Sequence, residues 1–234
     1  MTRTVMVTGS SSGIGRAISE RLLETGHRVV GLARTHDKFQ PDQDRYIPIS
    51  VDLSQQEELT DTVKSVLHQH PETDALISNA GQGAFGGIET FSPQQIESYF
   101  QLNLIAHALL ARAIVPHLKT RGGGDLLFMG SESALRGAQK GTLYCAAKFG
   151  LRGLAQSLRA ECASRGVRVS LINPGMVRTP FFDDLDFEPG PEETHAIPPE
   201  EVARTVSLVL NAAPGTVFDE INLSPLKKVL RSDR

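Results

Sequence analysis

The sequence contains no tryptophan, only two cysteines and little net charge. Cys145 and Cys162 are too few for a disulfide framework, and no cysteine and histidine group has the spacing of a zinc site. The formal net charge of −3 provides no electrostatic attraction to nucleic acid or to an anionic membrane. We therefore expect no metal, no nucleic acid and no membrane among the partners of this chain.

Long hydrophobic runs are also lacking. No apolar run comes near the ~18 residues that a membrane-spanning helix requires, and the first apolar run passes directly into glycine and serine, unlike a signal peptide. These absences predict a cytoplasmic protein. Of the 234 residues, 40% are hydrophobic and 22% charged. This composition excludes intrinsic disorder and favours a single domain, residues 1–234, with a sizeable core.

Short β-branched runs alternate with longer segments of helical period. We expect strands at residues 4–8, 28–33, 46–51, 75–78, 125–129, 167–172 and 217–223. Two helices are marked by apolar faces (Ala17, Ile18, Leu22 and Leu23; Leu59, Val63, Val66 and Leu67), and two long helices by residues 93–118 and 142–164. The alternation predicts an α/β fold, with a doubly wound parallel sheet of about seven strands and helices on both faces.

One region, residues 173–198, has no clear periodicity and holds five of the 13 prolines. An irregular stretch of this length in a folded domain is typically functional, and we expect residues 176–199 to form a substrate lid. Phe181, Phe182, Leu185 and Phe187 alternate there with acids, and no lysine or arginine lies between Thr179 and His195. This composition favours neutral or cationic substrates; alternatively, the acids simply face water.

A glycine-rich segment, Thr8-Gly-Ser-Ser-Ser-Gly-Ile-Gly15, stands between the first expected strand and the first expected helix. Gly9 allows a tight turn, Gly13 lets the backbone approach a pyrophosphate, and Gly15 lets the helix pack closely on the strand. The helix N-terminus beyond it attracts phosphate. The alternative is a flexible glycine and serine turn.

Tyr144 and Lys148 are four residues apart, so a helix places both side chains on one face. The ammonium group should lower the pKa of the Tyr144 phenol and make it a general acid or base near neutral pH. Ser131 follows the fifth expected strand, at the sheet edge where α/β proteins bind ligands. Ser133 is the alternative to Ser131.

These residues, together with Asn79-Ala80-Gly81, Asn103 and Asn173-Pro174-Gly175, resemble the short-chain dehydrogenase/reductase family in order and spacing over residues 4–180. The resemblance implies a Rossmann fold and an oxidoreductase that interconverts a secondary alcohol and a ketone or aldehyde by hydride transfer (EC 1.1.1.-).

The same resemblance implies the roles of four catalytic residues. Tyr144 would be the general acid or base, and Lys148 would tune it and hydrogen-bond the nicotinamide ribose. Ser131 would orient the carbonyl oxygen. Asn103 would hold a water that links Lys148 to solvent; its alternative is a capping or solvent-facing amide.

The cofactor-binding residues follow from the resemblance as well. They are Gly9, Ser11, Ser12, Gly13, Ile14, Gly15, Arg34, Asp52, Leu53, Asn79, Ala80, Gly81, Tyr144, Lys148, Pro174, Gly175, Val177 and Thr179. Ala33 stands where relatives that prefer NAD have aspartate, and Arg34 suits a 2′-phosphate, so we expect NADP. Alternatively, Arg34 is an ordinary solvated side chain and Asp37 binds the ribose.

The resemblance also implies a homodimer or homotetramer built on the two long helices, since apolar residues surround much of the first. Residues 219–225 are similar to the branch that contains NADP-dependent 3-hydroxy acid and serine dehydrogenases. Two other functions remain as alternatives, a non-catalytic NADP-binding regulator and a Rossmann-like methyltransferase. Neither requires Ser131, Tyr144 and Lys148 together.

Overall fold

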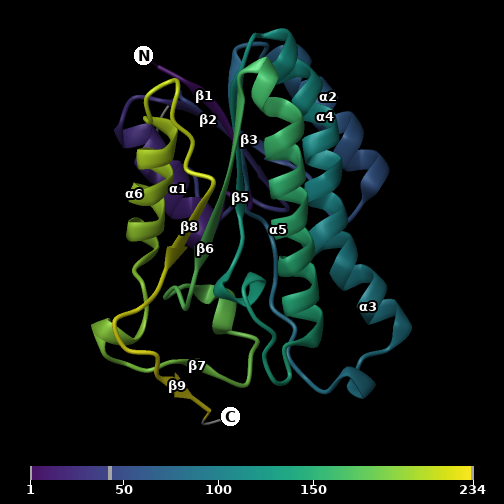
Figure 1. Cartoon of the computed structure of the whole chain (residues 1–234), viewed down its shortest axis with the longest axis vertical. Coiled ribbons are helices and arrows are strands. Elements are labelled where there is room, and N and C mark those ends of the chain that lie inside the picture. The colour runs from purple at the N-terminus through teal and green to yellow at the C-terminus, as the bar shows by residue number, and fades with distance from the viewer. Residues whose placement is uncertain (1, 42–43, 233–234) are drawn as a thin grey trace.

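The computed structural model describes residues 2–41 and 44–232 of the chain. Within them, seven parallel strands form one sheet in the order β3-β2-β1-β4-β5-β6-β8 (Figure 1). Their bounds are β1 Thr4–Thr8, β2 Arg28–Ala33, β3 Tyr46–Ser50, β4 Thr73–Ser78, β5 Gly124–Met129, β6 Val167–Pro174 and β8 Glu220–Leu223. The predicted doubly wound parallel sheet is confirmed.

Strand β1 lies at the centre of the sheet, and all five of its residues are buried. It pairs in parallel with β2 on one side and with β4 on the other. Because the chain reverses its direction of winding here, the crevice at the carboxyl ends of β1 and β4 is the expected ligand site of such a sheet.

Helices cover both faces of the sheet (Figure 1). On one face lie α1 (Gly13–Glu24) and α6 (Pro199–Leu210), which pack on a core that includes Ile18, Leu22 and Val206. The other face is covered by α2 (Gln56–Gln69), α4 (Ala106–Thr120) and α5 (Thr142–Cys162). Helix α6 was absent from the expected elements. It starts at Pro199, directly after the residues expected to be irregular, and proline is favourable at the first helical position.

The helix expected over residues 93–118 is interrupted. It consists of α3 (Pro93–Phe100), a π-helical turn (Gln101–Ile105) and α4. Pro93–Thr120 as a whole is long and apolar enough to cross a membrane by length and composition alone, so the expectation that no run approaches this limit was wrong. In this fold Leu110, Ile114 and Leu118 are at most 1% exposed, because α4 packs on the sheet.

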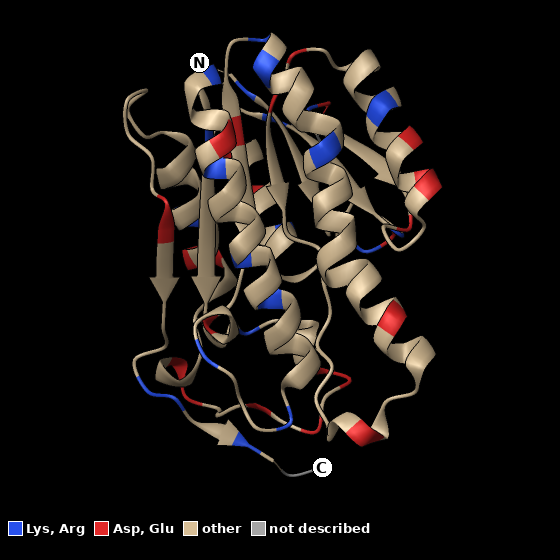
Figure 2. Ribbon diagram, turned by 45° about the vertical axis from the view of Figure 1, so that its right-hand side comes forward, with Lys and Arg blue, Asp and Glu red and all other residues tan. Residues whose placement is uncertain are grey.

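The irregular segment after β6 is tied to the C-terminal part of the chain. Strand β7 (Glu188–Pro189) pairs antiparallel with β9 (Leu230–Arg231), at the lower end of the molecule in Figure 1. The backbone N–H of Lys227 also donates to the carbonyl oxygen of Thr194 at 2.9 Å. Acidic segments and the basic C-terminal segment lie together at this end (Figure 2). The segment expected to be irregular therefore has a defined path below the carboxyl edge of the sheet.

Candidate active site

The glycine-rich segment forms a tight loop between β1 and α1. Gly9 and Gly13 have positive φ angles of 67° and 51°, which glycine adopts at little cost. A Cβ atom at Gly15 would lie 2.1 Å from the Gly9 carbonyl oxygen, so no side chain fits there. Ser12, at the start of α1, makes no side-chain cap hydrogen bond. The first-turn N–H groups thus lack a side-chain cap, and the loop fits a phosphate group.

The ends of β1 and β4 are joined by a small hydrogen-bond cluster beside this loop. The Thr8 hydroxyl oxygen accepts from the backbone N–H groups of Asn79 (2.9 Å) and Ala80 (3.0 Å). The Asn79 amide donates back to the Thr8 carbonyl oxygen at 2.9 Å. The cluster holds Asn79-Ala80-Gly81 against the glycine loop. Thr8 is a positioning residue that the expected set omitted, although the motif begins with it.

Residues expected at the adenosine end surround the carboxyl ends of β2 and β3. Arg34 is exposed, and no hydrogen bond or ion pair joins its guanidinium to another residue of the described ranges. Hydrogen bonds from Ser54 lower the pKa of Asp52, and the charge of Arg34 lowers it further. Leu53 is 5% exposed and belongs to the core. Arg34 is therefore a cation open to a ligand.

Tyr144 lies in the first turn of α5, beside Ser131 at the end of β5. The Ser131 side chain lowers the pKa of the Tyr144 phenol, and its hydroxyl oxygen accepts from the Ser133 backbone N–H at 3.2 Å. Ser131 is thus the serine that meets Tyr144, and Ser133 supports it. The backbone N–H of Ser131 donates to Oδ1 of Asn173 at 3.2 Å. Asn173 is fully buried and anchors this turn to β8, because its Nδ2 donates to Glu220 and Asn222.

The pKa of Tyr144 is raised in the structure, whereas the sequence predicted a lowered pKa. Burial of the phenol raises its pKa to about 12, although the hydrogen bond from Ser131 acts in the opposite direction. The expectation that Lys148 lowers this pKa in the free protein was wrong, since the desolvation cost of a phenolate at this position dominates. At neutral pH the Tyr144 hydroxyl is protonated and can act as an acid.

Lys148 is buried, at 5% exposure, one helical turn after Tyr144. Its Nζ donates to the Met129 carbonyl oxygen at 2.9 Å and lies 5.9 Å from the centroid of the Tyr144 ring. Burial lowers the pKa of Lys148 to about 8. The predicted juxtaposition of the two side chains is confirmed, and Lys148 can gain or lose a proton close to neutral pH.

Asn103 lies in the π-helical turn, and its side chain is fully buried. Its Oδ1 accepts from the Gln82 backbone N–H at 3.0 Å, and its Nδ2 donates to the Tyr99 carbonyl oxygen at 3.0 Å. The alternative of a capping or solvent-facing amide is therefore excluded. Both polar atoms of the amide have backbone partners, so the side chain anchors the loop after β4. A π turn of this kind commonly marks a functional site.

The nicotinamide end is formed by the start of the lid. The Gly175 N–H donates to the Leu223 carbonyl oxygen at 2.8 Å, and Val177 is buried in the core beside α6. A Cβ atom at Gly13 would lie 3.4 Å from Cβ of Thr179. The glycine loop and the lid thus meet directly. Pro174 ends β6, so one continuous edge carries the residues expected to bind the cofactor.

Two nearby residues were missed by sequence reasoning. His107 is buried one turn after Asn103, and its Nδ1 hydrogen-bonds the Ser78 hydroxyl at 2.7 Å. Burial, together with the charge of Lys148, lowers the pKa of His107 to about 3, so the ring is neutral. Phe85 lies with its ring centroid 5.1 Å from that of Tyr144. Neither stands in a motif, and only the fold brings them to the site.

Comparison with known proteins agrees with this geometry. The family model for short chain dehydrogenases matches residues 3–188. The chain belongs to the short-chain dehydrogenase family. It is 28% identical over 232 residues to an uncharacterized oxidoreductase of Staphylococcus saprophyticus, covering 96% of this chain and 97% of the relative. The protein is therefore an oxidoreductase whose family binds NAD(P) and acts on small molecules.

Two solved structures show the same fold. A metagenomic short-chain oxidoreductase in complex with NADP has 30% identity and a TM-score of 0.83, covering 97% of this chain and 98% of that one. An alcohol dehydrogenase from the archaeon Thermococcus sibiricus, complexed with 5-hydroxy-NADP, has 25% identity and a TM-score of 0.86, covering 98% and 99%. Both likenesses extend over the whole short-chain dehydrogenase fold.

Proposed function

We propose that this short-chain dehydrogenase interconverts a secondary alcohol and a ketone or aldehyde with NADP(H). The observation that carries the proposal is the convergence of Ser131, Tyr144 and Lys148 at the carboxyl edge of the sheet, next to the glycine loop. A non-catalytic NADP-binding protein does not require a protonated phenol and a buried amine at one place. The same holds for a methyltransferase.

Each of these residues has a step in the proposed reduction. The Tyr144 hydroxyl donates its proton to the carbonyl oxygen, and Ser131 holds this oxygen through a second hydrogen bond. Lys148, with a pKa of about 8, replaces the proton on Tyr144. Asn103 holds the loop after β4 through Gln82. The nicotinamide cofactor supplies the hydride in reduction and accepts it in oxidation.

We infer the preference for NADP from Arg34. Its guanidinium is exposed and beside Asp52, and no carboxylate stands at Ala33 to repel a phosphate. Ser11 and Ser12 add hydroxyl donors at the loop. The two neighbouring structures that hold NADP or a derivative of it support this assignment.

The test is a comparison of wild type with Arg34→Ala, in NADPH and NADH oxidation on a panel of carbonyl compounds. Loss of a charge-assisted phosphate contact should raise the KM for NADPH by a factor that corresponds to roughly 1.5–3 kcal/mol and leave the KM for NADH nearly unchanged. Equal changes in the KM values for NADPH and NADH would contradict the proposal that Arg34 binds the 2′-phosphate. NADPH binding without turnover of any carbonyl compound would favour the non-catalytic alternative.

We also propose a homodimer or homotetramer in the cytoplasm, with residues 176–199 as the substrate lid of a single domain. Ile105 and Phe149, on the two helical segments expected at the interface, are 39% and 44% exposed. Exposed apolar side chains of this kind favour burial against a second copy. Light scattering at micromolar concentration tests the assembly, and a monomer contradicts it. The similarity of residues 219–225 to one branch stays a prediction.

A further inference from the structure

Five aromatic rings form a closed circuit over the proposed catalytic tyrosine. Tyr144 contacts Phe85 and Phe181, with ring centroids 5.1 and 5.9 Å away. Phe85 contacts Phe187 at 4.9 Å, and Phe181 contacts Phe182 at 5.2 Å. Phe182 and Phe187 close the circuit at 5.9 Å. We call these four phenylalanines the aromatic wall.

The aromatic wall is separate from the hydrophobic core. Its rings are half-buried, and none belongs to the core clusters on either face of the sheet. Phe85 comes from the loop after β4, whereas Phe181, Phe182 and Phe187 come from the lid. Because these segments are far apart in the sequence, only the folded site brings the rings together.

Gly83 makes room for the two rings that contact Tyr144. A Cβ atom at Gly83 would lie 2.8 Å from Phe181 and 3.1 Å from Phe85. Any other residue here would push at least one ring away. The absence of a side chain at Gly83 therefore allows Phe85 and Phe181 to pack against the Tyr144 ring.

Three cations close to the lid are bonded to oxygen atoms of the protein. Nη2 of Arg178 donates to the carbonyl oxygens of Gly190 (2.9 Å) and Glu192 (3.0 Å). Lys227 and Lys228 are paired with Glu192 and Glu132. The acids of the lid are exposed, as the alternative expectation held (Asp183, Asp184, Asp186, Glu188, Glu192 and Glu193). The partly exposed rings of the wall thus offer apolar surface to a ligand, and the three cations named above are already bonded to oxygen atoms of the protein.

We propose that this enzyme acts on neutral aryl ketones and aldehydes, or on the corresponding alcohols, with the aryl group held against Phe85 and Phe181. The proposal rests on the oxidoreductase function above. Hydride from NADPH adds to the carbonyl carbon, and the π electron pair moves to the oxygen, which takes the Tyr144 proton. The products are the alcohol and NADP⁺, and solvent returns one proton to the enzyme.

The physical basis is the distribution of charge on aromatic rings. Ring faces are negative and ring edges positive, so an aryl group gains tilted or offset contacts with phenylalanine beyond the burial of its area. A carbonyl substituent withdraws electrons from the aryl ring and strengthens such contacts. A saturated ring of similar size buries a similar area but lacks this electrostatic contribution to binding.

The experiment compares methyl phenyl ketone with methyl cyclohexyl ketone, in wild type, Phe85→Leu and Phe181→Leu. Wild type should favour the aryl ketone about tenfold in kcat/KM, and each leucine variant should bring this ratio close to one, mainly through KM. The KM for NADPH should not change. Phe218→Leu is the matched control, because Phe218 packs on the core beside α6, outside the circuit. It should keep the wild-type ratio.

A second arm does not depend on turnover. Calorimetry measures the Kd of the two ketones for the NADP⁺-loaded protein and the variants. A ketone and NADP⁺ are both oxidised and cannot react, and the same aryl preference and its loss are expected. Equal affinities in wild type, or a preference that both variants retain, overturn the proposal. If NADPH binds but no carbonyl compound of any kind is reduced, the proposed function fails, while the binding arm still decides the role of the aromatic wall.

A third arm tests the neutrality of the substrate. Methyl phenyl ketone carrying a para-carboxylate is compared with its methyl ester. The ester should be the better substrate. A preference of about tenfold or more for the carboxylate would overturn neutrality and point to Arg136 or Lys140, which are exposed on the loop after Ser131.

Discussion

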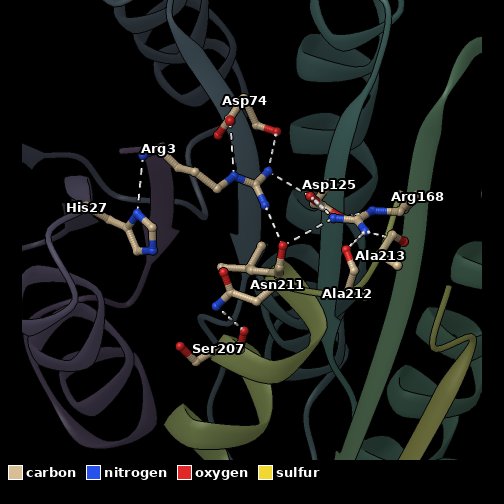
Figure 3. Close-up of polar contacts among 10 residues, drawn as sticks. Arg3, His27, Asp74, Asp125, Arg168, Ser207, Asn211, Ala212 and Ala213 are labelled. Atoms are coloured by element: carbon tan, nitrogen blue, oxygen red, sulfur yellow. Dashed lines mark hydrogen bonds and ion pairs between the residues drawn. The ribbon is translucent and has the colours of Figure 1, made fainter. Parts of the chain in front are cut away.

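Buried charged side chains have different partners at the two ends of the sheet. At the amino end of the strands, Asp125 is 2% exposed and accepts from Arg3 at 2.7 Å and from Arg168 at 2.7 and 2.8 Å (Figure 3). Both arginines also donate to the carbonyl oxygen of Leu210 at the end of α6. At the carboxyl end, Lys148 is also buried, but its Nζ donates to the neutral carbonyl oxygen of Met129.

The pKa values express this difference. Burial by itself would lower the pKa of Arg3, but the charges of Asp125 and Asp74 outweigh it and raise the pKa. The pKa of Lys148 falls to about 8 through burial, and no carboxylate in the described part of the chain offsets this effect. Paired buried charges tie strands and helix ends together, whereas an unpaired buried amine can change its protonation near neutral pH. The amino end of the sheet therefore stabilises the fold, whereas the carboxyl end carries a group that can exchange a proton near neutral pH.

The largest expected effect lies at the carboxyl end. Tyr144→Phe removes the proton donor and keeps the ring, so kcat should fall by about 100- to 10,000-fold. NADPH affinity, measured by titration of the bound-cofactor fluorescence, should stay within a few-fold, and the unfolding midpoint should not fall. More than about one hundredth of wild-type kcat in the variant contradicts the role of Tyr144. Ser131→Ala should reduce kcat in the same sense but less.

The amino end should respond in stability. Asp125→Ala leaves the partly buried guanidinium groups of Arg3 and Arg168 without their shared carboxylate, at a cost of about 3–5 kcal/mol in the free energy of unfolding. Denaturant unfolding measures the loss. Asp74→Asn is the matched control, because Asp74 is 26% exposed and, within residues 2–41 and 44–232, forms its ion pair with Arg3 alone; it should cost about 1 kcal/mol or less. Equal costs for the two variants would show that burial of the pair does not matter.

The smallest expected change in the free energy of unfolding lies at the carboxyl end, and it depends on pH. Lys148→Met should raise the free energy of unfolding at pH 7 by about 2 kcal/mol, while kcat is lost. Between pH 8 and about 10.5 the unfolded chain binds more protons at Lys148 than the folded one, so wild type gains stability as pH rises. The advantage of the variant should therefore shrink over this range. A constant difference between the two proteins refutes the lowered pKa of Lys148.

Sequence reasoning succeeded where the signal is local. The strands of the sheet follow apolar runs such as residues 4–8, which are buried on both faces. The spacing of Tyr144 and Lys148 correctly predicted that both side chains lie on one face of a helix. It failed where a distant contact decides. The π turn at Asn103 follows from the bonds of its amide to Gln82 and Tyr99, and α6 is secured by packing on α1.

The parallel sheet, the family and the residues at the carboxyl edge could all be predicted from the sequence, because apolar periodicity and motif spacing act over short stretches of chain. The direction in which the Tyr144 pKa shifts depends on the folded chain, since desolvation depends on what covers the phenol. The aromatic wall likewise exists only after Phe85 and the lid meet over α5. Burial and ring contacts depend on which residues are neighbours in space, and they cannot be predicted from a single position in the sequence.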